Sequence, residues 1–353
     1  GTFLTRSGVL NSVHAFSESS IGSWFLAFFA VVLVVSIGLI GWRGDKLRSP
    51  GVIDSPLSRE AAFLANNVLF AVFAFVVLLG TVFPLIIEAL QNRQIAVGAP
   101  FFDKLSMPIG LALLTLMAIA PVLPWRKAST ETLRERLFWP TWCGVAALVA
   151  SLLLGAYGLA PLLTFTLGGV AAGAAMRQVV LATRRQGWRG LVGRANGGMI
   201  VHLGVILIAV ALGASNSFSK SQELSLVANV EASFSGHTFE LKDVVEVRDD
   251  RSISVKALVL VDGKKIYAPA ITKYTRIGMN VGTPSVRTSL TTDIYLTLEP
   301  PVRQDANEAR IKVFIKPMII WLWIGTALMA VGTVLAAFPG RRRKPTDATS
   351  APV

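Results

Sequence analysis

Residues 196–215 read NGGMIVHLGVILIAVALGAS, an apolar segment with one histidine and no other ionisable side chain. A helix of roughly 20 apolar residues is long enough to cross the hydrocarbon core of a bilayer. A histidine in hydrocarbon is costly in free energy and usually faces a partner or a functional site. The segment therefore predicts a transmembrane helix, and it marks His202 as a candidate functional residue.

The composition of the chain extends this prediction to the whole sequence. Of its 353 residues, 53% are hydrophobic and 16% are charged, whereas about a quarter of the residues of a soluble domain are charged. The formal net charge is +13. The Lys and Arg residues cluster between apolar spans, as orientation signals do, which argues against nucleic-acid binding. The single cysteine, Cys143, rules out an intrachain disulfide and a cysteine-based metal site.

Seven segments have the length and hydropathy of membrane spans. They lie near residues 21–42, 62–90, 105–125, 138–157, 159–181, 197–215 and 317–338. Loops rich in Lys and Arg alternate with loops that are poor in them, and the positive-inside rule places the basic loops and the RRRK tail in the cytoplasm. Seven spans with a cytoplasmic C-terminus place the N-terminus of the chain, and His14 with it, on the outer side.

Residues 216–312 form a different kind of sequence, in which β-branched residues alternate or cluster between turn signals. The Asp262-Gly263 pair lies between KALVLV and KKIYA and predicts a hairpin turn. The span count places this segment outside the membrane. The predicted fold class is therefore a polytopic α-helical membrane protein of about seven transmembrane helices, with one β-rich domain inserted before the last helix.

The predicted organisation has five parts. They are an outer segment with His14 (1–20), a six-helix membrane bundle (21–215), the β-rich domain (216–312), the last transmembrane helix (313–338) and a cytoplasmic tail (339–353). The chain opens at Gly1 without a methionine, and residues 1–14 lack the pattern of a signal peptide. We therefore expect an internal start: a fragment, a processed product or one half of a split protein.

Two interpretations of His202 follow from its position. On a helix, Gly198, Val205 and Ala209 share its face, so the surface beside the imidazole would accept a flat, bulky, apolar ligand. A metal on one ring nitrogen and a hydrogen bond on the other would satisfy a neutral imidazole. A buried histidine that is hydrogen-bonded to a neighbouring helix is the alternative, and position alone does not separate the two.

The other two histidines lie outside the predicted spans. His14 and Arg6 lie in RSGVLNSVHAF, directly before the first span. A cation beside an imidazole suits an anionic ligand that also carries a metal, such as haem with its propionates, and a solvated interface histidine is the alternative. His237 lies at a predicted turn of the β-rich domain, where we expect a plain surface role, since an isolated loop histidine seldom ligates metal.

His14 and His202 cannot ligate the same iron. His202 precedes Ser215, near the outer boundary, by 13 residues, and a helix rises about 1.5 Å per residue, so His202 lies roughly 20 Å below the outer face. Axial nitrogens on one iron are only about 4 Å apart. If both histidines bind haem, they serve two sites, and each site needs a second ligand from elsewhere.

Four stretches resemble the C-terminal half of the CcmF family, the membrane haem lyase subunits of bacterial cytochrome c maturation. They are GTFLTRSGVLNSVHAF, GGMIVHLGVILIAVALGAS, VGTPSVRTSLTTDIYLTLEP and IKVFIKPMIIWLWIGTALMAVG. The resemblance covers the whole chain in order, including the β-rich domain before the last span. The tryptophan-rich segment of the family and the first histidine of each of its two haem-ligand pairs are absent from this chain and would precede Gly1.

The resemblance implies cofactors and site residues. His14 matches the second ligand of a haem held transiently at the periplasmic face, and His202 matches the second axial ligand of a b-type haem in the membrane. We further expect Arg6 to contact a propionate and Gly198 to pack against the membrane haem.

The resemblance also implies partners and a location. The partners are the haem chaperone CcmE, CcmH- and CcmI-type subunits that handle apocytochrome, apocytochrome c itself, quinol, and the N-terminal half of the same protein. The location is the bacterial inner membrane, with the N-terminus of this chain and residues 216–312 in the periplasm and the C-terminus in the cytoplasm.

The implied function is that of the C-terminal part of a cytochrome c haem lyase, which helps position and reduce haem for thioether attachment to apocytochrome c. We do not expect this chain to be active alone, because it lacks the tryptophan-rich segment and two histidines of the family. Two alternatives remain. One is a haem transporter or exporter, for which inverted repeats and polar residues at mid-membrane are typical. The other is a non-catalytic membrane scaffold for the maturation complex.

Overall fold

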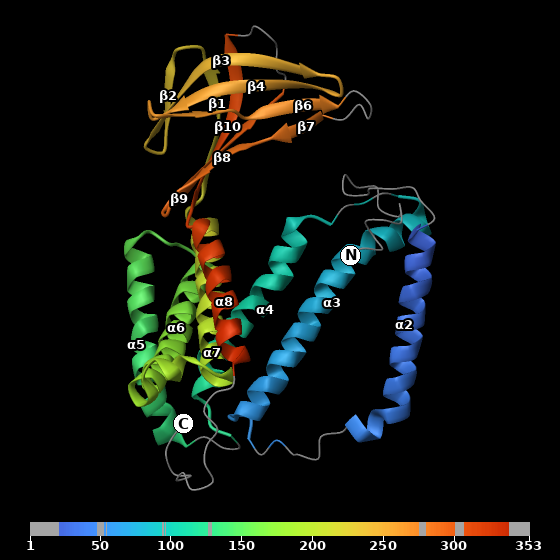
Figure 1. Cartoon of the computed structure of the whole chain (residues 1–353), viewed down its shortest axis with the longest axis vertical. Helices are drawn as coiled ribbons and strands as arrows, with labels where there is room; N and C mark the ends of the chain where they lie inside the picture. The colour runs from blue at the N-terminus through green and yellow to red at the C-terminus, as the bar shows by residue number, and fades with distance from the viewer. Residues whose placement is uncertain are drawn as a thin grey trace. The chain divides into compact units, whose positions relative to one another are not determined.

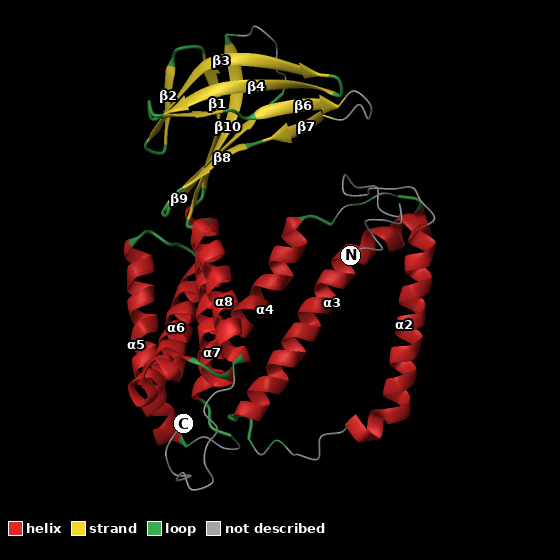
Figure 2. Cartoon of the chain, in the orientation of Figure 1, coloured by secondary structure: helices red, strands yellow, loops and turns green. Residues whose placement is uncertain are grey.

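The computed structural model combines long helices with a domain of antiparallel strands (Figures 1 and 2). Two compact units make up the chain: the first takes in residues up to 113 and residues 123–128, and the second takes in residues 114–122 and the chain from residue 129 onward. The structure describes residues 21–47, 53, 55–93, 95, 97–125, 129–274, 280–300 and 307–338.

Seven of the described helices are long and apolar enough to cross a membrane. They are α2 (Ile21–Arg43), α3 (Arg59–Gln91), α4 (Ala99–Ile119), α5 (Thr130–Leu153), α6 (Leu159–Gln186), α7 (Arg194–Phe218) and α8 (Ile320–Ala337). Three short 3-10 helices follow α2, α4 and α6: η1 (Gly44–Leu47), η2 (Ala120–Val122) and η3 (Gly187–Leu191). With the strands described below, these helices confirm the predicted fold class.

In the first unit, the start of α3 is fixed by polar contacts. Ser58 caps the helix, because its hydroxyl accepts a hydrogen bond from the Ala61 amide at 3.2 Å. The Arg59 side chain donates to the Leu123 carbonyl at 3.2 Å and lies over the Trp125 ring. Gly80 sets the approach of α3 to α4, since a Cβ at this position would meet the ring of Phe102 at 2.6 Å.

In the second unit, α7 and α8 pack backbone against backbone. A Cβ at Gly204 of α7 would lie 2.6 Å from the carbonyl oxygen of Gly325 in α8 and 2.6 Å from the Met329 side chain. Two turns earlier in α7, a Cβ at Gly197 would lie 2.4 Å from the backbone nitrogen of Ala336 in α8. A Cβ at Gly332 of α8 would lie 2.9 Å from the Gly197 carbonyl oxygen. Small residues at these positions let two membrane helices approach closely, which strengthens their dispersion contacts.

Helix α6 packs between α5 and α7 through small residues of its own. A Cβ at Gly168 would meet Val210 of α7 at 2.7 Å, and a Cβ at Gly169 would meet Ala147 of α5 at 2.7 Å. A small core joins Ala171 and Ile206 to the end of α4. A short connection joins α5 to α6, because α5 ends at Leu153 and α6 begins at Leu159.

The strands form two antiparallel sheets. One has the order β1-β10-β9-β8, and the other has the order β2-β3-β4-β6-β7, with β5 also paired to β4. The bounds are β1 (Lys220–Val227), β2 (Glu231–Phe234), β3 (His237–Asp249), β4 (Ser252–Val261), β5 (Lys265–Tyr267), β6 (Ala270–Tyr274), β7 (Asn280–Thr283), β8 (Ser285–Thr288), β9 (Thr292–Leu298) and β10 (Glu308–Pro317). We call this region the β-domain.

The two sheets of the β-domain share one apolar core. Alternate residues of β10 are buried, as expected for strands with one face on a core. Phe239 of β3, Val259 of β4, and Leu296 and Ile311 of the other sheet are all completely buried in it. The predicted hairpin at Asp262-Gly263 is confirmed: both residues have positive φ, at 54° and 61°, and the turn joins β4 to β5.

Short connections tie the β-domain to α7 and α8. Strand β1 begins two residues after α7 ends, and β10 ends three residues before α8 begins. These two strands are paired, with Lys220 opposite Ile315. At the second junction, Met318 has φ 60°, and its amide donates to the Thr291 carbonyl at 2.9 Å. Because the helix pair continues into a strand pair, few backbone torsions are left free at this joint.

The α7–α8 contact yields a stability prediction. We expect Gly204→Leu to lower the unfolding free energy by about 1–3 kcal/mol, because the new side chain would overlap the α8 backbone and an overpacked contact must shift. The measurement is the thermal unfolding midpoint of the detergent-solubilised protein. Gly198→Leu is the matched control on the same helix, since a Cβ there meets no described atom within 4 Å. Equal midpoints for the two variants would contradict the close packing at Gly204.

Candidate functional site

The structure places two of the three histidines. His202 lies in α7 and His237 begins β3. His14 and Arg6, which carry the predicted outer haem site, lie outside the described residues. No group of three or more His, Cys, Asp or Glu side chains that could hold a metal ion occurs among the residues that were placed.

His202 lies on a face of α7 with space beside it. Gly198 is one turn away on this face, and a Cβ added there would meet no described atom within 4 Å. The Nδ1 atom of His202 is buried and has no hydrogen-bond partner within the part of the chain that the structure describes. A buried polar atom without a partner costs free energy, so such atoms are rare and need an explanation. The alternative interpretation, a hydrogen bond to a neighbouring helix, finds no such bond in this region.

Two other faces of α7 are occupied by neighbouring helices. Gly197 and Gly204 lie against α8, while Ile206 and Val210 lie against α6. Successive residues of an α-helix are rotated by about 100° around its axis. By this rotation, His202 lies on the side of α7 away from the α8 contact and next to the α6 contact. The face with His202 and Gly198 is therefore a part of α7 that α6 and α8 leave for another group.

An apolar pocket of about 710 Å³ lies between α5, α6, α7 and α8. Its lining includes Gly168 and Ala172 of α6 and Leu203 and Val210 of α7, with Ser151 as one of few polar groups. His202 is not among its lining residues. The pocket can hold an apolar group, but it does not bring a polar or titratable side chain of α7 to that group.

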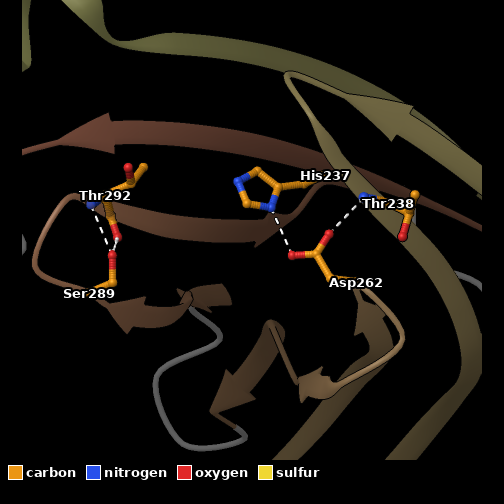
Figure 3. A network of polar contacts seen from close by, with 5 residues as sticks. All are labelled: His237, Thr238, Asp262, Ser289 and Thr292. Atoms are coloured by element: carbon orange, nitrogen blue, oxygen red, sulfur yellow. Dashed lines mark hydrogen bonds and ion pairs between the residues drawn. The ribbon is translucent and has the colours of Figure 1, made fainter.

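A polar pocket of about 460 Å³ lies in the β-domain, and we call it the β-domain pocket. On one side, the Nδ1 atom of His237 lies 2.8 Å from a carboxylate oxygen of Asp262, and the other carboxylate oxygen accepts from the Thr238 amide at 3.0 Å. On the other side, the Ser289 hydroxyl bonds to the backbone of Thr292. Figure 3 shows the His237 ring between Asp262 and the Ser289–Thr292 turn.

The electrostatics of this pocket keep Asp262 ionised. Partial burial raises the pKa of the Asp262 carboxyl, but the hydrogen bonds from His237 and the Thr238 amide and the charges of His237 and Lys264 outweigh it. The net effect is a pKa below the usual value for aspartate. Burial raises the pKa of the Tyr267 phenol, whose ring lies 5.2 Å from the Arg287 guanidinium.

Sequence reasoning did not find the β-domain pocket. It gave His237 a plain surface role, and it used Asp262 only as a turn residue. The two residues are 25 positions apart, and the pairing of β3 with β4 brings them together. The turn signal at Asp262-Gly263 was available, but nothing in the local sequence indicates which residue faces the turn.

The Asp262 contacts yield a pH prediction. Because the folded-state pKa is lowered, the carboxylate stabilises the fold fully above the pKa of an unfolded aspartate, about 3.9. That contribution is lost as the pH falls through the lower folded-state value. We expect Asp262→Asn to lower the thermal midpoint at pH 7 and the difference from wild type to shrink as the pH falls below about 4. Asp250→Asn, in an exposed turn, is the control. If the difference in thermal midpoint between Asp262→Asn and wild type does not change with pH, the stabilisation by the Asp262 carboxylate is not electrostatic.

Curated proteins of cytochrome c-type biogenesis are similar to almost the whole chain. The protein CcmF of Pseudomonas aeruginosa is 31% identical over 354 residues, which cover 97% of this chain and 53% of that protein. CcmF of Escherichia coli is 31% identical over 355 residues, with 98% and 54% covered. The protein ccl1 of Rhodobacter capsulatus is 32% identical over 367 residues, with 100% and 55% covered. The chain thus spans about half the length of these relatives.

A solved structure shares the fold. The "Cytochrome c Heme Lyase CcmF" matches with a TM-score of 0.72 and 26% sequence identity, over 92% of this chain and 52% of that one. No protein-family model matches the chain. The similarity in sequence and in structure runs across the helices and the β-domain together. The chain is therefore homologous to CcmF, the cytochrome c-type biogenesis protein, and corresponds to its C-terminal half.

Proposed function

We propose that this chain forms one part of a cytochrome c haem lyase and that His202 is an axial ligand of a b-type haem in the membrane. The homology to CcmF supports the role in cytochrome c maturation. The observation that carries the ligand assignment is the buried Nδ1 atom of His202, which has no hydrogen-bond partner among the described residues. An intramembrane ionisable residue without such a partner is a candidate for function.

The residues around His202 fit a haem. Histidine is a common axial ligand of haem iron, and the absent side chain of Gly198 leaves room one helical turn away. The other faces of α7 are packed against α6 and α8, so the helix holds the imidazole in a fixed direction. A bound haem would supply an iron centre that accepts and donates one electron. In the proposal, His202 orients that group and α7 supplies an apolar wall that excludes water.

The wider reaction is proposed from the homology. In it, the protein positions reduced haem so that its vinyl groups form thioethers with the cysteine thiols of apocytochrome c. His14 and Arg6, both outside the described residues, would hold haem transiently at the periplasmic face. The proposed partners are CcmE, CcmH- and CcmI-type subunits, apocytochrome c, quinol and the remaining half of the protein, which would supply the second axial ligands.

The ligand assignment is tested by replacing His202. In the full-length gene product, we expect His202→Ala to lower the haem bound per folded protein by roughly tenfold or more, because removing a ligand costs at least as much affinity as removing one of its supporting contacts. Gly198→Leu should also lower haem content, since the added side chain fills the space beside the imidazole, while the thermal midpoint of the haem-free protein stays near that of haem-free wild type. The measurements are haem absorbance per folded protein and thermal unfolding.

A control and the opposite outcome complete this test. Leu203→Ala changes the next residue of α7, which lines the apolar pocket instead, and should keep its haem. If His202→Ala binds as much haem per folded protein as wild type does, the membrane-haem assignment is wrong for this chain. The scaffold function would then be the better interpretation.

The proposed orientation places the chain in the inner membrane with the β-domain in the periplasm, as the Lys and Arg distribution indicates. In a Cys143→Ala background, a cysteine at Glu231, the exposed first residue of β2, should react with an impermeant thiol reagent in intact cells. A cysteine at Trp188, which is 84% exposed in η3, should react only after the membrane is opened. The reverse labelling pattern would invert the proposed topology.

A further inference from the structure

The β-domain pocket has an excess of positive charge. Three cationic side chains line it, Lys264, Lys265 and Arg287, against the one carboxylate of Asp262. Both carboxylate oxygens of Asp262 already accept hydrogen bonds within the domain. Neither lysine lies within ion-pair distance of a carboxylate in the part of the chain that the structure describes. Free cations grouped around one cavity create a potential that attracts an anion.

The pocket also offers hydrogen-bond donors suited to an oxyanion. The Arg287 guanidinium donates one bond to the Ile266 carbonyl at 2.8 Å, which fixes the head of this side chain beside Tyr267. The hydroxyl groups of Thr291 and Thr292 also line the pocket, whereas the Thr288 and Ser289 hydroxyls already donate to Asp293 and to the Thr292 carbonyl. Ammonium, guanidinium and hydroxyl donors together are the groups that bind phosphate oxygens. Asp293 lies on the face of β9 opposite to Thr292, with its side chain bonded to the Thr288 hydroxyl.

One wall of the pocket lies beside the start of α8. The carbonyl of Thr291 accepts from the Met318 amide at 2.9 Å, directly before α8 begins at Ile320. The neighbouring Leu290 carbonyl accepts from the indole of Trp321 in the first turn of α8 at 2.8 Å. Tryptophan side chains are enriched at membrane interfaces. Leu290 itself is 69% exposed at the tip of this otherwise polar turn, as expected for an apolar side chain that contacts lipid.

From the charge, the donors and this location together, we propose that the β-domain pocket binds the phosphate group of an anionic phospholipid headgroup. Lys264, Lys265 and Arg287 neutralise the phosphate, and the Ser289–Thr292 turn holds it at the level where α8 enters the bilayer. Binding of this kind anchors the β-domain to the membrane surface beside the helix pair. Contacts of lysine and arginine with anionic lipid strengthen such anchoring and weaken in high salt.

The test compares two lipids with the same acyl chains. The full-length protein in detergent is mixed with equal amounts of phosphatidylglycerol and phosphatidylcholine, and the lipids retained are counted by native mass spectrometry. We expect a preference for phosphatidylglycerol that falls about tenfold in Lys264→Glu/Lys265→Glu, because two charge-assisted contacts become repulsive. Lys256→Glu/Lys273→Glu makes the same charge change on β4 and β6, outside the pocket, and should keep the preference. A parallel titration uses inorganic phosphate alone.

Each outcome decides the proposal. Loss of the lipid preference in the pocket variant only, with an unchanged thermal midpoint, supports it. Saturable binding of inorganic phosphate without any lipid preference would assign the pocket to a soluble phosphate and overturn the lipid source. Equal lipid retention by wild type and both double variants would overturn the site itself.

Discussion

The close approach of α7 and α8 is the contact on which the second unit depends. Glycines on both helices, Gly197 and Gly204 facing Gly325 and Gly332, let the two backbones meet without side chains between them. In a membrane there is little hydrophobic driving force between helices, so packing of this kind supplies much of the attraction. The same two chain segments then continue as β1 and β10, which are hydrogen-bonded to each other. Paired strands lie about 4.8 Å apart, and helices that already approach closely can pass into such a pair through connections of one or two residues.

This packing also determines what α7 can do with its remaining surface. Gly204 and Gly197 lie against α8, Val210 lies against α6, and Ile206 lies in the small core with the end of α4. The face with His202 and Gly198 is left with an unpartnered buried nitrogen and with open space. In the proposed function these two features are related, because an imidazole that no neighbouring helix engages is available to a ligand, and a planar ligand needs room beside it. The rigid helix pair would hold the imidazole in place, and binding of a haem would offset the unfavourable free energy of burying the imidazole.

The joint between the helices and the β-domain connects a second set of residues to the membrane. Met318 adopts a left-handed conformation at this joint, and its amide bond to Thr291 brings the β8–β9 turn to the start of α8. The cations of the β-domain pocket line the same cavity as that turn, and they come from the β4–β5 hairpin and from β8. A domain that is held by two short connections and also by a lipid headgroup has little freedom to tilt. Such a domain would present a fixed surface to its partners.

The sequence by itself determined the spans, the β-domain between the last two of them and the turn at Asp262-Gly263, because hydrophobic length, alternation and turn chemistry are local properties. It also singled out His202 and Gly198, since an ionisable residue in an apolar run stands out without any structure. The comparisons then showed that the chain is homologous to CcmF, a cytochrome c-type biogenesis protein. Only the tertiary structure showed that Gly204 packs against a backbone while Gly198, six residues earlier on the same helix, faces open space. Only it brought His237 to Asp262 and placed Arg287 in the same pocket as both lysines, because this arrangement depends on strand pairing between distant segments, which no local pattern encodes.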